Sequence, residues 1–376
     1  MIFRRIAIMN FVVVFALCLG SLVLSSSAQT ADSPSNNSRI AWNAILKQKD
    51  AWYGEDEAVR IADNVLVYQR NSGGWPKNID MAAVLSGDQV TALTKQKASI
   101  DSNIDNGATY TQLIFLARVY QARKLERHQE SFLAGLDYLF RAQYANGGWP
   151  QYFPNSQSYY KHITYNDGAM IGVLKVLRDI AQEKVVYSFV DPARRERARI
   201  AVQKGTDCIL KTQVKVGDRL TVWGAQHDEV TLAPAPARAF EPVALASLES
   251  VGIVRFLMGI KQPSQQVINA VEAAVNWFER AKISGIKWIE KPDKSSGEFE
   301  RVAVKDKNAG PIWARFYELE SNRGIFIGRD SVIKYSVDEI EAERRNGYRW
   351  YDDEPAQLLN KEYPAWRQKL LQKQAR

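Results

Sequence analysis

The sequence contains few cysteines. Two occur in 376 residues, and one of them, Cys18, lies in an apolar segment near the N-terminus. If that segment is removed, Cys208 is the cysteine that remains, and a single cysteine cannot form an internal disulfide. The fold must therefore be stabilised by a large hydrophobic core rather than by cross-links. About 340 residues are left, which is enough for one large domain or two ordinary ones.

Histidine and the common catalytic motifs are also scarce. The three histidines, His128, His162 and His227, leave little material for a histidine-centred mechanism. The Gly-x-Ser-x-Gly motif of serine hydrolases does not occur, and Cys208 has no activating context. No cysteines and histidines have the spacing of a zinc site, and the lysines and arginines are dispersed. We therefore expect no nucleic-acid partner.

Long apolar runs are rare, and the clearest one is at the N-terminus. Residues 6–24 are mostly apolar, follow two arginines and precede small residues up to Ala28. This order is typical of a secretory signal peptide. A membrane anchor is the alternative, but polar residues interrupt the run and a Ser/Asn-rich stretch follows it. We expect a secreted or periplasmic protein with no membrane attachment after cleavage, divided into a signal peptide over 1–28, a polar tether over 29–38 and one domain over 39–376.

Acidic residues are outnumbered by basic ones. Lysine and arginine total 50 against 42 aspartate and glutamate residues, which gives a formal net charge of +8. Loss of Arg4 and Arg5 with the signal peptide lowers this charge by two, to +6. A moderately basic protein suits an anionic partner, although a basic surface without such a partner gives the same count.

Apolar residues recur at helical intervals through much of the chain. Four segments show the pattern, and they are residues 58–66, 113–120, 170–181 and 267–278. Signals for strands are thin, and the clearest is a short hairpin formed by Ile325–Ile327 and Val332–Tyr335. No low-complexity segment marks a linker between domains. The sequence therefore predicts one mainly α domain with a smaller irregular or β-containing part.

A glycine-rich motif occurs twice, 74 residues apart. The two copies are Gly73-Gly74-Trp75-Pro76-Lys77 and Gly147-Gly148-Trp149-Pro150-Gln151. Each copy follows a helical segment and precedes an acidic loop that opens the next helix, and these loops are Asp105-Asn106-Gly107 and Asn166-Asp167-Gly168. The repeated unit of helix, glycine-rich loop, acidic loop and helix is typical of a toroid of helical hairpins.

The acidic loops are the first candidates for chemistry. Asp and Asn before a helix often do no more than cap it. In stacked hairpins, however, equivalent loops emerge at the same rim, so Asp105 and Asp167 are expected to face one cleft. Their carboxylates and the neighbouring amide oxygens of Asn106 and Asn166 would form an all-oxygen set, which suits Ca²⁺ better than zinc. The same carboxylates could instead serve as acid and base in a glycoside hydrolase.

Arginines among aromatic residues are the second set of candidates. Arg238, Arg315 and Arg329 lie beside aromatics or in turns rich in proline and glycine. An arginine is usually a solvated surface group, but in these settings a guanidinium could be held over a cleft and bind a carboxylate in bidentate fashion. A non-catalytic protein that binds sugar acids would use the same arginines.

Aromatic residues and histidines are the third set. His227 lies in a polar context that could reach the cleft. Several aromatic residues could offer faces on which sugars stack, or could fill the core at turns, and these are Trp75, Trp149, Trp223 and Tyr317.

Several ordered strings together make the chain resemble the pectate lyases of polysaccharide lyase family 10. Between about residue 42 and residue 351 they include both glycine-rich motifs, Ile104–Thr109, His162–Met170, Trp223–Asp228, Ala237–Glu241, Trp313–Glu320 and Gly328–Asp330. The resemblance implies an (α/α) toroid of three helical hairpins around a central cleft. It also implies Ca²⁺-dependent cleavage of α-1,4-linked polygalacturonate by β-elimination, giving 4,5-unsaturated oligogalacturonides.

The resemblance also implies roles for individual residues. Asp105, Asn106 and Asp167 would hold calcium, and Arg238 would be the catalytic base. Arg315 and Arg329 would bind uronate carboxylates. From their settings in the sequence, we expect Asn166, Trp223 and His227 to contact the substrate as well. Phe240 departs from the family, which usually has tyrosine at this position. Because a free guanidinium is almost always protonated, an arginine base predicts an alkaline pH optimum. Polygalacturonate is the expected partner of a monomeric enzyme.

Overall fold

The structure is a computed structural model that describes residues 40–155, 157–292 and 299–374. The predicted signal peptide and tether lie outside the described residues. Contacts group the chain from Ile40 onward into one compact unit. Within the described part of the chain, no helix is both long and apolar enough to cross a membrane.

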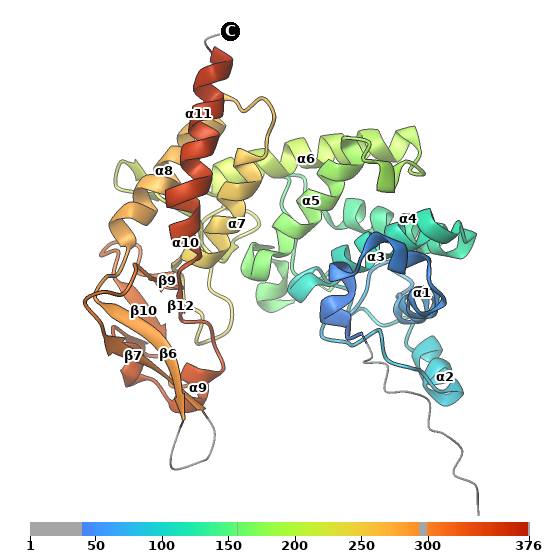
Figure 1. The fold of residues 1–376 in the computed structure, drawn as a ribbon, viewed down its shortest axis with the longest axis horizontal. Coiled ribbons are helices and arrows are strands. Elements are labelled where there is room, and N and C mark those ends of the chain that lie inside the picture. Colours follow the sequence, from blue (N-terminus) through green and yellow to red (C-terminus); the bar gives the residue numbers. More distant parts are fainter. Residues whose placement is uncertain (1–39, 156, 293–298, 375–376) are drawn as a thin grey trace, which may run out of the picture. The chain divides into compact units, whose positions relative to one another are not determined.

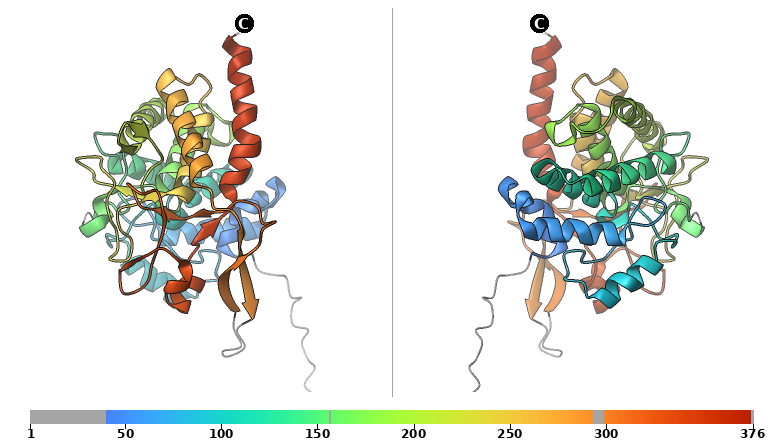
Figure 2. Two further views of the ribbon diagram at one scale, coloured as in Figure 1. Left: turned by 90° about the vertical axis from the view of Figure 1, so that its left-hand side faces the viewer. Right: turned by 90° about the vertical axis from the view of Figure 1, so that its right-hand side faces the viewer.

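Helices form most of the described structure, as the sequence predicted (Figure 1). The α-helices are α1 (Asp56–Tyr68), α2 (Gly87–Lys95), α3 (Tyr110–Arg123), α4 (Glu126–Ala142), α5 (Ala169–Ala181), α6 (Pro192–Thr212), α7 (Ser247–Met258), α8 (Gln265–Ala281), α9 (Ala342–Asn346), α10 (Glu354–Gln357) and α11 (Tyr363–Gln374). Consecutive helices pair as α3 with α4, α5 with α6 and α7 with α8. The views of Figure 2 show α11 standing out from the other helices.

The helix pairs are arranged in two series. Helices α1, α3, α5 and α7 contact one another in order, and α4, α6 and α8 do the same. Local sequence explains where helices begin, since Asp191 accepts a hydrogen bond from the Arg194 backbone N–H at 2.9 Å and Pro192 follows at the first helical position of α6. Burial explains where they pack, because α5 buries the apolar face that includes Met170, Leu174 and Leu177.

The strands are short and occur mainly in the C-terminal part. They are β1 (Ile163–Thr164), β2 (Lys215–Val216), β3 (Arg219–Leu220), β4 (Gln226–His227), β5 (Leu245–Ala246), β6 (Ile286–Pro292), β7 (Phe299–Lys305), β8 (Trp313–Ala314), β9 (Phe316–Tyr317), β10 (Gly324–Ile327), β11 (Ile333–Lys334) and β12 (Tyr351–Asp352). One sheet has the order β11-β10-β9-β5, and the two-stranded sheets pair β1 with β4, β8 with β12, β2 with β3 and β6 with β7. The predicted hairpin is confirmed, because β10 and β11 pair antiparallel with Phe326 opposite Lys334.

A tryptophan fixes the loop after each of four helices. Its indole N–H donates a hydrogen bond to a carbonyl in the last turn of the preceding helix. The bonds are Trp75 to Val65 of α1 (2.7 Å), Trp149 to Leu139 of α4 (2.8 Å), Trp223 to Ile209 of α6 (2.7 Å) and Trp313 to Phe278 of α8 (2.8 Å). All four rings are fully buried. The structural unit thus recurs four times, although the glycine-rich motif marks two of the copies in the sequence.

Glutamines after three of these helices join each helix to the next one. The side-chain amide of Gln69 donates to Ser131 in α4 at 2.9 Å, and that of Gln143 donates to Ala201 in α6 at 3.0 Å. Gln213 does the same to Ala270 in α8 at 2.9 Å. Helices α1, α4, α6 and α8 are therefore linked in register. Since every loop leaves the same end of its helix, the loops gather along one side of the helical layer.

The close packing of the second glycine-rich loop against α6 leads to a testable prediction for stability. Gly147 has φ +96°, and a Cβ there would lie 2.0 Å from the Lys204 carbonyl oxygen in α6. We expect Gly147→Ala to lower the free energy of unfolding by at least about 2 kcal/mol, because both the backbone and the neighbouring helix must move. Gly252→Ala is the control, since Gly252 lies inside α7 with no heavy atom near its Cβ position. It should raise stability by about 0.5–1 kcal/mol. Urea unfolding of the two variants measures both changes, and equal midpoints would contradict this account of the loop.

Candidate active site

The two acidic loops lie side by side. Each forms a short 3₁₀ turn, Asp105–Gly107 and Asn166–Gly168, and the two turns are in contact. In both, the second residue adopts a left-handed backbone, with φ 49° at Asn106 and 50° at Asp167. Asn and Asp tolerate this conformation better than other residues with a Cβ. The fold therefore brings the carboxylates of two distant loops together.

Neither carboxylate acts as a helix cap. The Asp105 side chain is buried, and its Oδ2 forms an ion pair with Lys77. Its other oxygen, Oδ1, is buried with no hydrogen-bond partner among the described residues. Asp167 accepts hydrogen bonds from Arg315 Nη2 at 3.0 Å and from the Asn166 amide at 2.8 Å. The capping role that is common for these residue types is thus replaced by contacts within the site.

Tyr110 shows that the two carboxylates act on one place. Tyr110 is the first residue of α3, which begins shortly after the first acidic turn. Burial raises the pKa of Tyr110 to about 12, and the negative charges of Asp105 and Asp167 both add to the effect. The charges of both acidic turns therefore reach the same phenol.

The donor set at the acidic turns fits a hard cation. Asp105 presents a buried carboxylate oxygen without a partner, and the Asp167 carboxylate and the Asn106 side chain lie on the adjoining turns. Oxygen ligands of this kind are those that Ca²⁺ prefers. An unsatisfied buried carboxylate oxygen is costly unless something binds it. The residues predicted to hold calcium are therefore placed where they could do so.

A second cluster of possible ligands lies at His162, Asp228 and Glu229. One ligand atom from each residue lies within 4.8 Å of the others. Several of their polar atoms already have protein partners, because Glu229 pairs with Lys161 at 3.0 Å and contacts His162 at 3.1 Å. Asp228 accepts backbone N–H bonds from the turn that follows it. These residues are therefore engaged in hydrogen bonds and ion pairs within the protein.

Arg315 connects the second acidic turn to helix α7. Its side chain is buried, and its Nη2 donates to Asn166 at 3.2 Å, to Asp167 at 3.0 Å and to Glu249 in α7 at 2.5 Å. Burial alone would lower the pKa of Arg315, but the negative charges of Glu249 and Asp167 outweigh it and raise that pKa. Arg315, predicted to bind a substrate carboxylate, thus also orients the acidic turn.

Arg238 lies on a turn that adjoins the second acidic turn. Its side chain is half-exposed, and its Nε donates to Glu241 at 2.9 Å. The hydrogen bond to Glu241 raises the pKa of Arg238 above its ordinary value. Glu241 and Asn166 line one small pocket of about 20 Å³, together with Ala237 and Phe316. The Arg238 turn and the second acidic turn therefore meet, although more than 70 residues separate them in the chain.

Arg329 lies beside Arg238 at the Phe240 ring. The guanidinium carbon is 5.1 Å from the ring centre for Arg329 and 4.9 Å for Arg238. Arg329 is exposed and pairs with Glu343 at 2.8 Å, which raises the pKa of Arg329. Arg238 and Arg329 thus both contact Phe240, at the exposed side of the site.

Two residues predicted to bind substrate are placed in the core instead. Trp223 is fully buried, and its indole bonds to α6 as described above. His227 is also fully buried, with one ring nitrogen 2.9 Å from the Leu232 carbonyl and the other accepting the Gly224 N–H at 3.1 Å. Burial lowers the pKa of His227 to about 4, so the ring stays neutral. Direct contact of Trp223 and His227 with a sugar is therefore corrected to a structural role, because no surface of either is free. Trp75, Trp149 and Tyr317 are likewise buried.

Other residues of the site were not predicted. Lys77, Tyr110 and Glu249 each contact or influence the acidic turns. The sequence offered a signal for Lys77, because it is the position at which the two glycine-rich motifs differ, with Gln151 in the second copy. Glu249 had none, since it lies on the face of an apolar helix and meets its partners through the fold alone.

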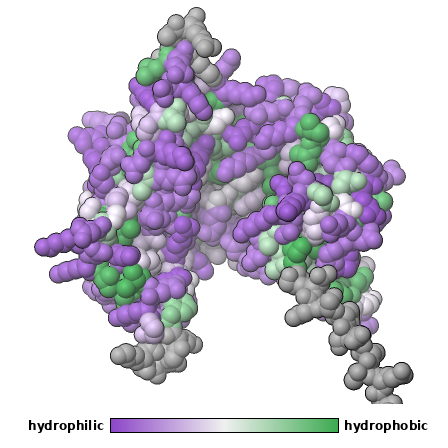
Figure 3. All heavy atoms as spheres, in the orientation of Figure 1, coloured by the Kyte–Doolittle hydropathy of each residue, from purple (hydrophilic) through white to green (hydrophobic). Residues whose placement is uncertain are grey.

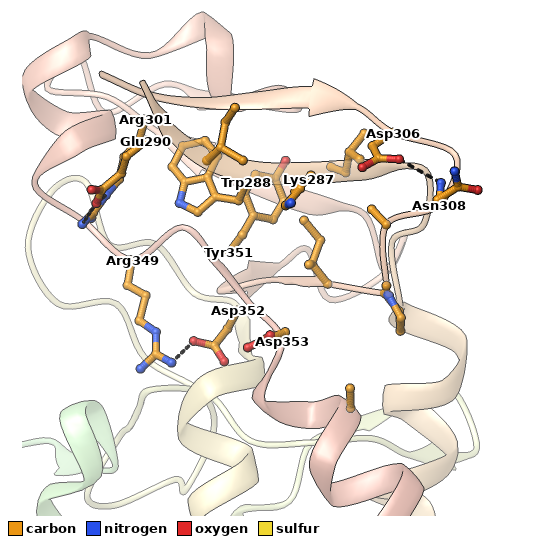
Figure 4. Close-up of a pocket in the computed structure, with 17 residues that line it drawn as sticks. Lys287, Trp288, Glu290, Arg301, Asp306, Asn308, Arg349, Tyr351, Asp352 and Asp353 are labelled. Atoms are coloured by element: carbon orange, nitrogen blue, oxygen red, sulfur yellow. Dashed lines mark hydrogen bonds and ion pairs between the residues drawn. The ribbon is translucent and has the colours of Figure 1, made fainter. Parts of the chain in front are cut away.

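A larger pocket lies away from these residues. It has a volume of about 810 Å³ and lies between β6, the segment 306–312 and β12. Figure 4 shows Trp288 and Tyr351 there, with ring centres 5.3 Å apart, and the ion pair of Arg349 with Asp352. Its lining mixes charges of both signs and includes none of the predicted site residues. The face drawn in Figure 3 is mostly hydrophilic, with small separate apolar patches.

Comparison with known proteins identifies the family. The family model described as pectic acid lyase matches residues 69–359. Among solved structures, a mutant family 10 polysaccharide lyase from Cellvibrio cellulosa in complex with trigalacturonic acid is 34% identical, with a TM-score of 0.72, covering 85% of this chain and 94% of that one. Another structure of the family 10 lyase from Cellvibrio cellulosa is 33% identical, with a TM-score of 0.71, covering 85% of this chain and 92% of that one. No curated protein matched. The chain belongs to the pectic acid lyase family, polysaccharide lyase family 10.

Proposed function

We propose that this lyase cleaves α-1,4-linked polygalacturonate by Ca²⁺-dependent β-elimination, with Arg238 as the base, and releases 4,5-unsaturated oligogalacturonides. One observation carries the proposal: the acidic turns at Asp105 and Asp167 are in contact, and the Arg238 turn adjoins the second of them through Glu241 and Asn166. These contacts support a cation site and a basic side chain in one region, as an elimination next to a carboxylate requires.

The substrate class is supported by charge and by a relative. The related Cellvibrio lyase is described in complex with trigalacturonic acid. In this chain Arg238 and Arg329 lie together at the exposed side of the site, and the net charge is +8. Clustered guanidinium groups attract and orient uronate carboxylates. A polymer of galacturonate is the substrate that fits both features.

The chemistry requires positive charge because the C5 proton of a uronate is weakly acidic. The carboxylate beside it is already negative and resists further charge as the proton leaves. Bound calcium would neutralise that carboxylate and stabilise the added charge. In the proposed site Asp105, Asn106 and Asp167 would hold the ion. Asn166 lies beside Asp167 and would contact the sugar, and Arg329 would bind a neighbouring carboxylate.

Arg238 would move the proton. The C5–H bond would break, with the proton passing to a guanidine nitrogen of Arg238. Its electron pair would form the C4–C5 double bond as the C4–O bond breaks, and the departing sugar oxygen would take a proton from water. This step needs Arg238 to be deprotonated when it acts, whereas the bond to Glu241 stabilises its protonated form. The pairing must therefore open or weaken when substrate and cation bind. High pH would help, since it increases the deprotonated fraction.

The remaining expectations from the sequence complete the proposal. We infer that the two series of helices form an (α/α) toroid of three hairpins around a central cleft. Export through the predicted signal peptide would place a monomeric enzyme in the periplasm or the medium, where pectic polymers occur. The basic charge of the mature chain suits that substrate.

A glycoside hydrolase is supported less well by the contacts. It would need one carboxyl as the acid, one as the base and a water between them. Here Asp105 contacts Lys77 and Asp167 contacts Arg315, so both are joined to cations. A binding protein without turnover would use Arg238 and Arg329 for affinity alone, and the following assay separates the three functions.

The test is cleavage of polygalacturonate followed at the ultraviolet absorbance of unsaturated uronides. We expect product with added Ca²⁺, none with a chelator, and little with Asp105→Asn or Asp167→Asn. Arg238→Lys should lower kcat at least about a hundredfold, the scale of losing a general base, while substrate binding is retained. Asp228→Asn is the matched control, because it removes a carboxylate outside the acidic turns. Chelator-resistant cleavage with no absorbing product would show a hydrolase, and binding without cleavage would show a binder.

The Glu241 contact gives a prediction for pH. Because its hydrogen bond raises the pKa of Arg238, Glu241→Gln should lower that pKa. More Arg238 is then deprotonated at any given pH, so the rising limb of the pH–rate curve should move to lower pH. The wild-type optimum should be alkaline. Initial rates between pH 6 and pH 11 at saturating Ca²⁺ measure both effects. A wild-type optimum below neutrality, or a shift to higher pH in the variant, would argue against an arginine base.

A further inference from the structure

Arginines and aromatic rings alternate from the acidic turn to Arg238. Arg315, which contacts Asp167, has its guanidinium carbon 4.6 Å from the centre of the Tyr348 ring. Arg344 lies 4.1 Å from the same ring and 4.6 Å from the Phe240 ring. The guanidinium carbon of Arg238 lies 4.9 Å from the centre of the Phe240 ring. A continuous line of contacts therefore joins the cation site to the proposed base, with Arg344 at its middle.

Arg344 differs from the other arginines of this line. It is buried, with 5% of its surface exposed, and among the described residues it makes no ion pair. Its Nη2 is buried without a hydrogen-bond partner, and its Nε is 3.4 Å from the Ile327 carbonyl oxygen. Burial of an uncompensated cation is unfavourable. The faces of three rings, Phe240, Tyr348 and Trp350, supply the attraction that holds it there.

We propose that Arg344 is a positioning residue, which fixes Phe240 and through it the guanidinium of Arg238, and whose unpaired charge opposes protonation of Arg238. The inference rests on the proposed function, in which Arg238 takes a proton. Arg344 lies on the short helix α9, in a segment for which the sequence showed no motif. Its role would be local and electrostatic, because it has no contact with the acidic turns themselves.

The charges around Arg238 show why such a residue matters. Glu241, Tyr348 and Tyr159 all favour the protonated form of Arg238 and raise its pKa. The positive charges of Arg344 and Arg329 act in the opposite direction and favour the deprotonated form of Arg238. Burial lowers the pKa of Arg344 and outweighs Tyr348 and Glu241, which raise it, and the nearby charges of Arg238 and Arg329 lower it further. Because repulsion between like charges is mutual, Arg344 also disfavours a proton on Arg238.

Phe240 is the contact through which position is transmitted. Three guanidinium groups, those of Arg238, Arg329 and Arg344, lie within 5.1 Å of its ring centre. The attraction comes from the face of the ring, which phenylalanine and tyrosine both provide. Phenylalanine in place of the family's usual tyrosine therefore keeps the ring face that the guanidinium groups contact. Phe240→Tyr should be tolerated, whereas Phe240→Leu removes the face and should not be.

The test compares two neighbouring buried arginines. Arg344→Met keeps the length of the side chain and removes its charge. If Arg344 opposes protonation of Arg238, the pH–rate curve should move up by about one unit, the Coulomb effect expected of one charge within about 10 Å at partial burial. At a fixed pH on the rising limb, kcat then falls about tenfold, with KM changed less than about twofold. Arg345→Met is the control, because Arg345 lies in the same helix, is similarly buried and pairs with Glu300. It should lower thermal stability without moving the pH–rate curve.

Two further variants separate position from charge. Arg344→Lys keeps the charge and loses the planar stack, so the pH–rate curve should stay in place while kcat falls. Phe240→Leu should lower kcat in the same way, and its half-buried position makes it a usable variant if Arg344→Met does not fold. An unmoved curve in folded Arg344→Met, or full kcat in Phe240→Leu, would overturn the proposal. These outcomes are distinguishable from failure of the proposed function, in which Arg238→Lys itself would retain full turnover.

Discussion

The site depends on the hydrogen bond by which a buried tryptophan ties each loop to the end of its helix. Trp75, Trp149 and Trp223 all donate to a last-turn carbonyl of the helix before them. Because the donor is an indole within the core, the loop has one position relative to its helix. Helices joined in register then place successive loops beside one another. The meeting of Asp105 with the Asp167 turn follows from this repeated constraint rather than from any local attraction between carboxylates.

Like charges brought together in this way must be compensated. Lys77 contacts Asp105, and the buried Arg315 joins Asp167 to Glu249. These cations make the pair of turns tolerable while one oxygen of Asp105 stays without a partner. On the other side of Arg315, Tyr348 and Arg344 continue the contacts to Phe240 and Arg238. The oxygen-rich and guanidinium-rich halves of the site are thus one connected arrangement.

The sequence predicted those features that depend on local pattern. Helical periodicity located α1, α3, α5 and α8, and turn residues located the β10–β11 hairpin. The repeat was found in two copies, while the described structure has four, because Trp223 and Trp313 make the bond outside a Gly-Gly-Trp-Pro motif. Trp223 was assigned to substrate for its aromatic face and His227 for its polar context, and neither feature in the sequence reveals that both side chains are buried. Glu249 and Arg344 could not be found, since their partners lie on other elements and no motif marks them.

Calcium binding, measured by calorimetry in the presence of trigalacturonate, tests the central claim most directly. Wild-type protein should bind one Ca²⁺, and both Asp105→Asn and Asp167→Asn should abolish the heat of binding, because each turn supplies one carboxylate to a shared ion. Asp228→Asn, in the separate cluster with His162 and Glu229, should bind as the wild type does. Unchanged binding in both acidic-turn variants, or loss of binding in Asp228→Asn alone, would contradict a site formed where the two turns meet.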